Sequence, residues 1–391
     1  MIRTYRYRLY PNRTQAWTLA RLLETHRTIY NDALTERREA WRQCRVSASY
    51  KTQAGQLKAI RAFDEEAAFA NYSSLQHTLR RLDKAFAAFF RRVKAGQTPG
   101  YPRYKGRARF DSFEYTYSDG CKLRDVDGKV RFYVQNAGLM RIKYHRPIPE
   151  GATIKHVIIR RQLGKWYAYL MWEAEDAPAP VHNGPAVGID VGLHHLLALS
   201  DGTTVENPRW LRHGLADLRV AQRRLSRRKK GSNRRRKAAF QVAKRHGHIA
   251  NVRHDFWHKV TRTLADTYSL IALEDLSLAF MIQNEHLALS AHDAALGEFR
   301  QMLDYKAEYA GSQVVLVNPR NTSQVCSRCG SLVPKTLDVR VHSCPDCGLT
   351  IDRDVNAALN ILTLARTGPS GPNVSQHTER ALRSRRLQAT E

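Results

Sequence analysis

Hydrophobic and basic residues alternate along the first ten positions of the chain. Tyr5, Tyr7 and Leu9 share one face, with arginines between them, and this period of two predicts a β-strand over residues 2–10. Asn12, directly after a proline, is a favourable N-cap, so we expect a helix to begin there.

The segment 12–98 has the apolar periodicity of helices. Leu75 and Leu79 belong to its clearest stripe, which we interpret as the buried face of a helix that runs over about 63–93. Residues 110–175 return to a period of two and end in a predicted hairpin. We therefore expect a small antiparallel sheet or barrel, with helices inserted after its first strand.

The pattern changes after a linker rich in alanine and proline at 177–180. Short buried strands now alternate with helices, which is typical of an α/β domain. The tail from Arg366 is rich in Gly, Pro, Ser and charge, and is predicted to be disordered. The predicted elements are a strand and turn over 186–193, strands over 195–199, 270–273 and 314–317, two long helices over 209–266, and a short helix over 355–364.

Composition narrows the class of function. The chain has 391 residues, of which 42% are hydrophobic, so it is long enough for two to three domains with cores. A net charge of +28 favours an anionic partner, with nucleic acid ahead of a membrane surface. No segment is long and apolar enough to span a membrane, and the first residues lack a signal-peptide pattern. We expect a monomeric cytoplasmic protein with reduced thiols.

Four of the six cysteines form two C-x-x-C pairs with fourteen residues between them. This spacing is typical of a tetrahedral zinc–thiolate site, whereas a redox pair usually stands alone at the start of a helix. A glycine follows each pair, where the backbone must turn back toward the metal. Four thiolates close the coordination shell, so the zinc would be structural. The candidate ligands are Cys326, Cys329, Cys344 and Cys347, and the isolated Cys44 and Cys121 are predicted to be free thiols.

Three carboxylates stand at the ends of apolar elements in this basic chain: Asp190, Glu274 and Asp354. One such residue is more often an N-cap or a turn residue, but three at element ends can converge at one edge of a sheet. Converging carboxylates repel one another unless a cation lies among them, and their oxygens suit Mg²⁺, which promotes phosphodiester hydrolysis. We interpret Gly188 and Gly192 as leaving room for nucleic-acid backbone beside Asp190.

A basic run without acidic residues lies between Arg219 and Arg245. Its thirteen Lys and Arg predict a phosphate-contacting surface on two helices, which we favour over a solvated face because no acids compensate the charge. A second basic segment, 101–107, contains tyrosines, and there nucleic-acid contact and local packing are equally open. The candidate contacts are Arg223, Arg224, Arg227, Arg228, Lys229, Lys230, Arg234, Arg235 and Arg236 in the run, and Tyr101, Arg103 and Lys105 in the second segment.

Four motifs occur in a characteristic order: Gly-Ile-Asp-Val-Gly at 188–192, Leu-Glu-Asp-Leu at 273–276, the paired C-x-x-C knuckles, and Asp-Arg-Asp-Val-Asn-Ala-Ala-Leu-Asn-Ile at 352–361. With these motifs the chain resembles the TnpB family, the RNA-guided nucleases of bacterial insertion sequences, which are similar to the ancestors of type V CRISPR effectors. The resemblance is strong over 186–365. It is moderate over 8–12, 74–79 and 100–105.

The resemblance implies a multidomain α+β fold in which a β-barrel carries an inserted helical lobe and is followed by a nuclease domain. The nuclease domain would be an RNase H-like α/β domain of the RuvC type. The implied boundaries are 1–11 and 99–178 for a wedge-like β-barrel, 12–98 for a helical recognition lobe, 184–365 for the RuvC domain with basic helices at 209–266 and an inserted zinc ribbon at 321–350, and 366–391 for the tail.

The resemblance also implies an activity, that of an RNA-guided DNA endonuclease encoded by a transposable element. A guide RNA from the transposon end would pair with target double-stranded DNA next to a short adjacent motif. The Mg²⁺ ligands would be Asp190, Glu274 and Asp354. Asp352 is the weaker choice as a ligand, because residues two apart on a helix point in different directions. Gln76 is expected to face the adjacent motif, and Ser118 to lie near the corresponding barrel loop.

Two other functions remain open at this point. A guide-dependent DNA-binding repressor would share the partners without cutting DNA, and a zinc-ribbon RNA-binding factor would explain the charge and the cysteines. Neither alternative accounts for three carboxylates at element ends. Labelled target DNA can be exposed to the purified complex with and without Mg²⁺. Cleavage that requires Mg²⁺ would distinguish the nuclease from the repressor and from the RNA-binding factor.

Overall fold

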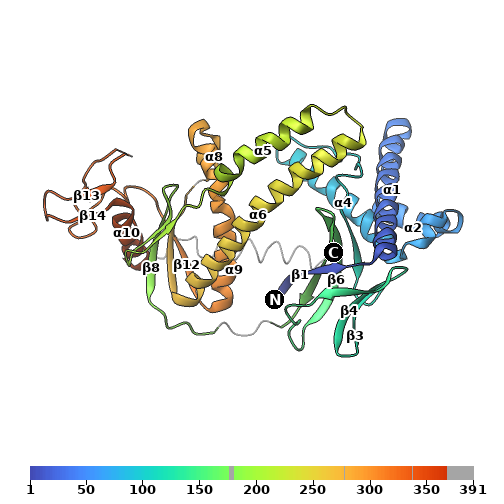
Figure 1. Ribbon diagram of the computed structural model, residues 1–391, viewed down its shortest axis with the longest axis horizontal. Helices are drawn as coiled ribbons and strands as arrows, with labels where there is room; N and C mark the ends of the chain where they lie inside the picture. Colours follow the sequence, from blue (N-terminus) through green and yellow to red (C-terminus); the bar gives the residue numbers. More distant parts are fainter. Residues whose placement is uncertain (176–179, 277, 337, 368–391) are drawn as a thin grey trace. The chain divides into compact units, whose positions relative to one another are not determined.

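The computed structural model describes residues 1–175, 180–276, 278–336 and 338–367. It divides the chain into two compact units, Met1–Ala177 and Pro178–Glu391 (Figure 1). Most of the predicted linker and nearly all of the predicted tail lie outside the described residues. Within the described residues, no helix is long and apolar enough to cross a membrane.

The first unit contains a seven-stranded antiparallel sheet with the strand order β2-β6-β7-β1-β5-β4-β3. The alternation noted in the first ten residues has its predicted result, because Tyr7 and Leu9 are fully buried. The predicted hairpin is β6 and β7, which pair along their length. The strands are β1 (Ile2–Tyr10), β2 (Ser112–Thr116), β3 (Cys121–Val126), β4 (Lys129–Val134), β5 (Gly138–Lys143), β6 (Thr153–Gln162) and β7 (Lys165–Glu173).

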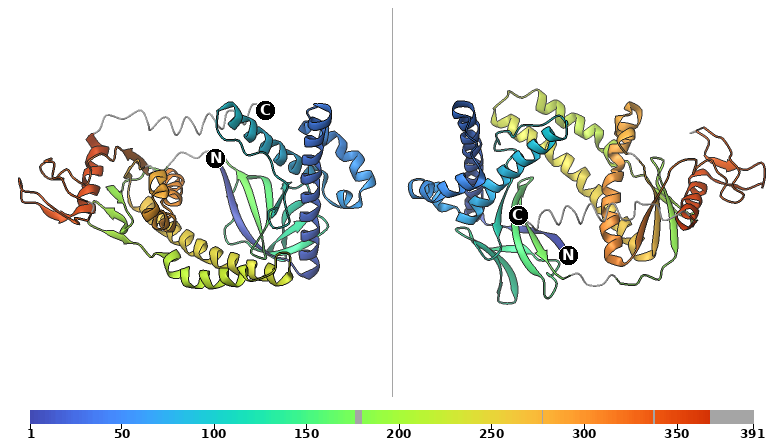
Figure 2. Two further views of the ribbon diagram at one scale, coloured as in Figure 1. Left: turned by 90° about the horizontal axis from the view of Figure 1, so that it is seen from above. Right: turned by 180° about the vertical axis from the view of Figure 1, so that it is seen from behind.

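Helices lie between β1 and β2 in the sequence, as predicted, and they pack beside the sheet (Figure 2). There are four, and the second of them was not predicted. Asn12 caps the first helix, since its side chain accepts a hydrogen bond of 2.8 Å from the Gln15 backbone N–H. The predicted single block over about 63–93 is wrong in its bounds. Asp64 and Asn71 each act as an N-cap and start a new helix. The helices are α1 (Arg13–Cys44), α2 (Tyr50–Phe63), α3 (Glu65–Phe69) and α4 (Tyr72–Lys94).

The second unit contains a five-stranded mixed sheet with the order β10-β9-β8-β11-β12. The three strands β8, β11 and β12 run parallel, while β9 and β10 extend the sheet as antiparallel strands. Strand positions agree with the prediction, except that β10 was not predicted. The strands are β8 (Ala186–Val191), β9 (His195–Leu199), β10 (Thr204–Glu206), β11 (Leu270–Glu274) and β12 (Gln313–Val317).

Helices cover both faces of this sheet. The two long helices predicted over 209–266 are α5 (Trp210–Ser226) and α6 (Asn233–Thr267), and the short C-terminal helix is α10 (Arg353–Thr367). Helices α6 and α9 (Leu296–Ala310) lie on one face and α10 lies on the other (Figure 1). Trp257 of α6 and Phe299 of α9 pack with strand residues in one core cluster, and Ile361 of α10 packs in another. Not predicted were α7 (Leu278–Gln283), α8 (Glu285–Ala294), α9 (Leu296–Ala310), and the small strands β13 (Val341–Ser343) and β14 (Thr350–Asp352).

Candidate active site

Asp190 and Glu274 lie at the carboxyl ends of two adjacent parallel strands. β8 and β11 are in register, with Ile189 opposite Leu273, so the next residue on each strand is a carboxylate. Ile189 and Leu273 belong to the core beneath α6 and α9. Because side chains alternate along a strand, Asp190 and Glu274 point to the opposite face, which α10 covers.

Asp354 stands in the first turn of α10, on that same side of the sheet. Asp352 has a different task, because its Oδ1 accepts hydrogen bonds from the backbone N–H groups of Asp354 (2.8 Å) and Val355 (3.1 Å). It therefore caps the helix. Asp352 is exposed, whereas Asp354 is half-buried.

The three carboxylates interact electrostatically. Burial, together with the negative charges of Glu274 and Asp354, raises the pKa of Asp190 to about 7. Burial also raises the pKa of Glu274, while a hydrogen bond from the Thr322 hydroxyl lowers it. The ionised form of Asp190 is therefore disfavoured until a cation offsets the repulsion.

This donor set fits a hard divalent ion, because all three groups offer oxygen and they repel one another. Arg340 reaches Asp354 at 3.9 Å and is exposed at its side chain, so it neutralises that charge only weakly. The carboxylates are less tightly grouped than the cysteines. Within the described residues, two groups have ligand atoms that all lie within 4.8 Å of one another, and the carboxylates form neither of them.

Gly188 has a structural role that was not predicted. A Cβ on Gly188 would stand 2.0 Å from the Ala358 carbonyl oxygen and 2.7 Å from the Leu362 backbone nitrogen. The backbone of α10 therefore packs directly against Gly188. A Cβ on Gly192 would meet the His195 carbonyl oxygen at 2.9 Å, within its own turn. Both glycines allow close backbone approach inside the protein, and at Gly188 this approach is to α10. The predicted role beside nucleic acid stays a prediction.

The four predicted cysteines form one cluster. The Sγ atoms of Cys326 and Cys347 are 3.6 Å apart and those of Cys329 and Cys344 are 3.5 Å apart. These separations are far longer than a disulfide bond of about 2.05 Å. They are close to the ~3.8 Å expected between sulfurs that surround one ion with bonds of about 2.3 Å. The cluster is consistent with a structural zinc site.

The two knuckles repeat one backbone pattern. Gly330 donates its N–H to the Cys326 carbonyl at 2.9 Å, and Gly348 donates to the Cys344 carbonyl at 3.0 Å. Both glycines have positive φ, 78° and 68°, which confirms that the chain turns back after each pair.

Two buried asparagines join the cysteine cluster to α10. Asn356 donates to the Val325 carbonyl at 2.8 Å and accepts from the Ser327 N–H at 3.0 Å. Asn360 donates to the carbonyls of Thr322 (2.8 Å) and Val325 (2.7 Å). The helix that carries Asp354 is therefore hydrogen-bonded to the segment that carries the first knuckle. Sequence reasoning missed these residues, although both lie in the motif at 352–361.

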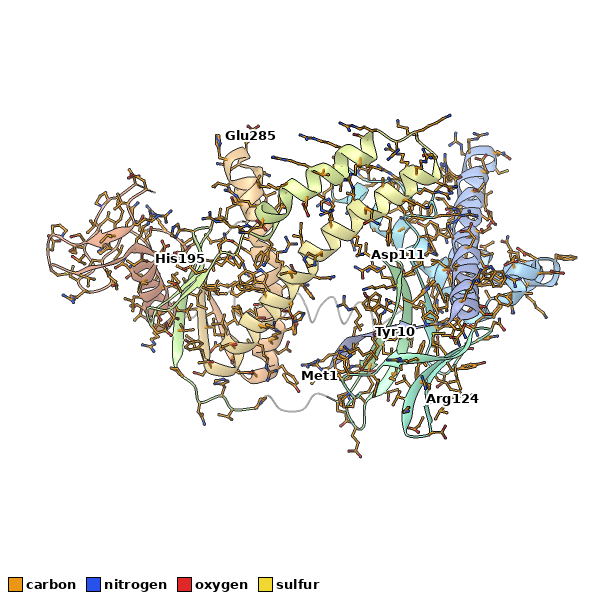
Figure 3. All side chains as sticks on the ribbon, in the orientation of Figure 1. Met1, Tyr10, Asp111, Arg124, His195 and Glu285 are labelled. Carbon is orange, nitrogen blue, oxygen red and sulfur yellow. The ribbon has the colours of Figure 1, made fainter. Side chains whose placement is uncertain are left out.

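The basic run forms the loop end of the α5–α6 hairpin, where nitrogen-tipped side chains project into solvent (Figure 3). Of its nine candidate contacts, only Arg235 is not exposed. The Arg235 guanidinium donates to the carbonyls of Leu225 and Arg228, at 3.0 Å each, and so satisfies the end of α5. Arg235 has a structural role, and the other eight side chains are available to phosphates.

The loop at 101–105 packs partly against the protein. The Tyr101 ring meets Phe86 and Phe89 edge to face, with centroids 5.6 Å and 5.3 Å away, and remains 44% exposed. The backbone of Lys105 is hydrogen-bonded to Asn31 through both its N–H and its carbonyl. Arg103 is exposed. Local packing thus accounts for part of the tyrosine pattern, and an exposed basic surface remains.

Ser118 lies in a turn that is hydrogen-bonded to the start of α4, the helix that carries Gln76. Ser118 is exposed, with φ of 69°, in the turn between β2 and β3. The neighbouring Asp119 accepts a hydrogen bond of 2.9 Å from Asn71, the N-cap of α4, and Gln76 follows on that helix as a half-buried residue. The turn and the start of α4 are therefore held together.

Three family models match separate parts of the chain. Residues 1–45 match a model described as "Helix-turn-helix domain", residues 169–285 match "Probable transposase" of the OrfB_IS605 type, and residues 297–361 match "Cas12f1-like, TNB domain". In the structure, residues 1–45 contain one strand and one long helix.

Related proteins match along most of the chain. A Streptomyces pristinaespiralis protein named "Putative RNA-guided DNA endonuclease" is 38% identical over 366 residues, which is 92% of this chain and 88% of that protein. The Escherichia coli K12 protein named "Putative RNA-guided DNA endonuclease InsQ" is 30% identical and covers 92% of each chain. The CRISPR-associated endodeoxyribonuclease Cas12f1 of Sulfoacidibacillus thermotolerans is 22% identical over 92% of this chain and 97% of that protein.

Among solved structures, a Cas12f1 chain in a complex with sgRNA and target DNA has a similar fold. Its TM-score is 0.55 at 16% identity, over 88% of this chain and 81% of that chain. At this identity the likeness concerns the fold alone.

Proposed function

Because this chain belongs to the TnpB family of RNA-guided DNA endonucleases of IS605-type elements, which is related to Cas12f, we propose that it cuts DNA with the carboxylate site of its second unit. A guide RNA pairs with one strand of target DNA beside a short adjacent motif. The site then hydrolyses phosphodiester bonds and leaves 5′-phosphate and 3′-hydroxyl ends. Sequence would be read by base pairing, while the protein contacts backbone and shape.

One observation carries this proposal: Asp190 and Glu274 lie at the carboxyl ends of two adjacent parallel strands, and Asp354 lies on the helix that packs on the same face of the sheet. The charges of Glu274 and Asp354 both act on Asp190. These three residues would hold Mg²⁺. The bound ion supplies the Lewis acidity that activates water and stabilises the leaving oxygen. The protein contributes the placement, since two ligands come from rigid adjacent strands and the third from a helix packed on them.

We propose different roles for the two units. We assign residues 1–11 and 99–178 to a wedge-like β-domain, 12–98 to a helical recognition lobe, and 184–365 to a RuvC domain with an inserted zinc ribbon at 321–350. In this assignment Gln76 and Ser118 face the adjacent motif in DNA. The exposed basic residues of the α5–α6 hairpin, together with Arg103, contact phosphates of the guide or the heteroduplex.

The test is cleavage by single variants of the complex with guide RNA. Asp190→Ala, Glu274→Ala and Asp354→Ala should each abolish cutting of a matched target in Mg²⁺, while binding of guide and target persists because the phosphate contacts lie elsewhere. Glu308→Ala, at an exposed acidic position of α9 outside the carboxylate site, is the matched control and should cut normally. Near wild-type cutting by Asp354→Ala would contradict the assignment.

The competing function is a guide-dependent repressor that binds without cutting. It predicts a wild-type complex that binds guide and target but leaves the DNA intact in both Mg²⁺ and Mn²⁺. The carboxylate site favours the nuclease, because a protein that only binds DNA gains nothing from three repelling carboxylates near a phosphate backbone. A zinc-ribbon RNA-binding factor leaves the same site unexplained.

A further inference from the structure

A second group of potential metal ligands lies in the first unit, remote in sequence from the carboxylates and the cysteines. His77 on α4, Glu114 on β2 and His156 on β6 each offer one ligand atom, and these atoms all lie within 4.8 Å of one another. The register of the sheet brings two of them together, because Thr116 pairs with His156 and Glu114 is two residues from Thr116 on the same face. Helix α4 supplies the third from above that face.

The distances within this group suit coordination better than direct pairing. Glu114 Oε1 is 3.4 Å from His156 Nδ1 and 3.7 Å from His77 Nδ1. Both separations exceed the ~3.2 Å limit of an ordinary N–H···O hydrogen bond. Around a tetrahedral ion with bonds of about 2.0–2.1 Å, neighbouring ligand atoms stand about 3.3–3.4 Å apart. Small side-chain movements would bring all three atoms to that spacing.

The hydrogen bonding of the histidine nitrogens also suits metal binding. His77 Nε2 is 3.0 Å from the Thr116 hydroxyl, which leaves the Nδ1 lone pair of that ring directed at Glu114 when Nε2 carries the proton. His156 Nδ1 is buried and makes no hydrogen bond. A buried nitrogen without a partner is costly, and a metal ion would satisfy it. The rings of His77 and His156 stand perpendicular, with centroids 5.3 Å apart, so both can present an edge to one point.

Burial favours the neutral form of the His77 imidazole. Burial lowers the pKa of His77, and the positive charges of His156, Arg80 and Lys84 act in the same direction, while Glu114 opposes them. A neutral imidazole is the form that binds metals. Two histidines and one carboxylate with an open fourth position are a donor set for Zn²⁺ and similar divalent transition-metal ions.

We propose that His77, Glu114 and His156 form a second metal site, which binds Zn²⁺ or a chemically similar ion and clamps helix α4 to the β2–β6 edge of the sheet. Gln76 directly precedes His77, so the ion also sets the orientation of this part of α4. That consequence for DNA recognition rests on the proposed function, whereas metal binding itself does not.

The experiment is a metal count on tag-free, full-length protein that is equilibrated with a small excess of Zn²⁺, desalted, and analysed by inductively coupled plasma mass spectrometry. Wild type should hold about two equivalents, one at the cysteines and one at this site. His77→Ala and His156→Ala should each hold about one, and His145→Ala, an exposed histidine of the same unit, should hold two. One equivalent in wild type, or two in the His77→Ala/His156→Ala double variant, would overturn the proposal in favour of a metal-free His–Glu pair.

Two milder variants separate loss of metal from loss of folding. Glu114→Gln removes a ligand but not the shape of the side chain, and Thr116→Val removes only the hydrogen-bond partner of His77. Thr116→Val should weaken Zn²⁺ binding about tenfold, as is usual for a partner behind a ligand. Co²⁺ should give a ligand-field spectrum without thiolate charge transfer at this site, which distinguishes it from the cysteine cluster. Unchanged affinity in both folded variants would again overturn the proposal.

Discussion

The hydroxyl of Thr322 donates a hydrogen bond to the carboxylate of Glu274. Thr322 follows β12 and lies just before the first cysteine knuckle, and its own carbonyl accepts from Asn360 of α10. One buried threonine therefore connects a candidate metal ligand with the helix that carries another. The cysteine cluster and the carboxylate site share this scaffold.

Thr322→Val should lower DNA cleavage about tenfold while leaving guide and target binding intact. Loss of the hydroxyl frees the Glu274 carboxylate to rotate and removes a bond that favours its ionised form. The measurement is the single-turnover cutting rate as a function of Mg²⁺ concentration, which should shift to higher Mg²⁺. Thr322→Ser keeps the hydroxyl and should recover most of the rate, and failure of that recovery would argue that packing matters instead.

Asp352 and Asp354 should respond differently to substitution. Asp352→Asn retains an oxygen that can cap α10, so we expect near wild-type cutting. Asp352→Ala loses the cap at a cost of about 1 kcal/mol in stability. Asp354→Asn should stop cutting without a comparable loss of stability. Thermal unfolding and cleavage, measured on the same preparations, distinguish a helix cap from a metal ligand. A cutting defect confined to the Asp352 variants would make Asp352 the ligand instead of Asp354.

The metal-free protein should lose stability as the pH rises from about 4 to 7. The pKa of Asp190 is raised from 3.8 in the unfolded chain to about 7 in the folded one, so the folded state holds this proton more tightly. The unfolded chain releases it first, and the free energy of unfolding falls across that window by at most about 4 kcal/mol. Above pH 7 this contribution becomes constant.

Asp190→Asn checks that pH dependence directly. The variant should be more stable than wild type at pH 8 in buffer without Mg²⁺, and the advantage should shrink toward pH 4, where Asp190 is already protonated. Denaturant unfolding at several pH values gives the free energy of unfolding of wild type and of the variant as a function of pH. Added Mg²⁺ should stabilise wild type at pH 8 but not the variant. If the difference in stability between variant and wild type does not change with pH, the explanation is wrong.

Cys326→Ser and Cys344→Ser should release the structural zinc and lower the unfolding temperature by ~5 °C or more, because zinc binding is coupled to folding. Cutting should fall as well, since Asn356 and Asn360 tie the first knuckle to α10. Cys44→Ser, at an exposed free thiol, is the control and should change neither property. A zinc-free variant that cuts normally would show that the cluster does not support the site.

The basic hairpin should act by neutralising phosphates. Replacement of Arg227, Arg228, Lys229 and Lys230 by Gln should weaken guide-RNA binding, because fewer counterions are released when the RNA binds. The slope of log affinity against log salt should fall by about 1 for each phosphate that is no longer neutralised. The same exchange at Lys51 and Lys58 of α2 provides a control. Affinity that stays constant across a salt titration would place the RNA elsewhere.

Sequence patterns predicted the elements whose signals are local. The strands β8 and β11, the cysteine spacing and the N-cap Asn12 each follow from neighbours within a few residues. The bonds from Thr322 to Glu274 and from Asn360 to Val325 join residues 48 and 35 positions apart, and no local pattern marks them. The cluster of His77, Glu114 and His156 was missed for the same reason.

At two further residues, packing explains why the structure differs from the interpretation of the sequence. Arg235 looks like its basic neighbours in sequence, but the end of α5 leaves carbonyls that its guanidinium satisfies. Gly188 looks like a glycine that makes room for a ligand, whereas in the structure α10 packs directly against it. Composition indicates which chemistry a segment can perform, and only the tertiary arrangement decides which partner it meets.

During synthesis, the three carboxylates of the site leave the ribosome at different times. Asp190 and Glu274 leave the ribosome first, followed by the cysteine knuckles, and Asp354 arrives with α10, the last described helix. The exposed basic hairpin between β10 and β11 is complete well before then. A nascent or prematurely released chain therefore carries its positively charged surface while the third carboxylate is still missing, so attraction to nucleic acid precedes completion of the site.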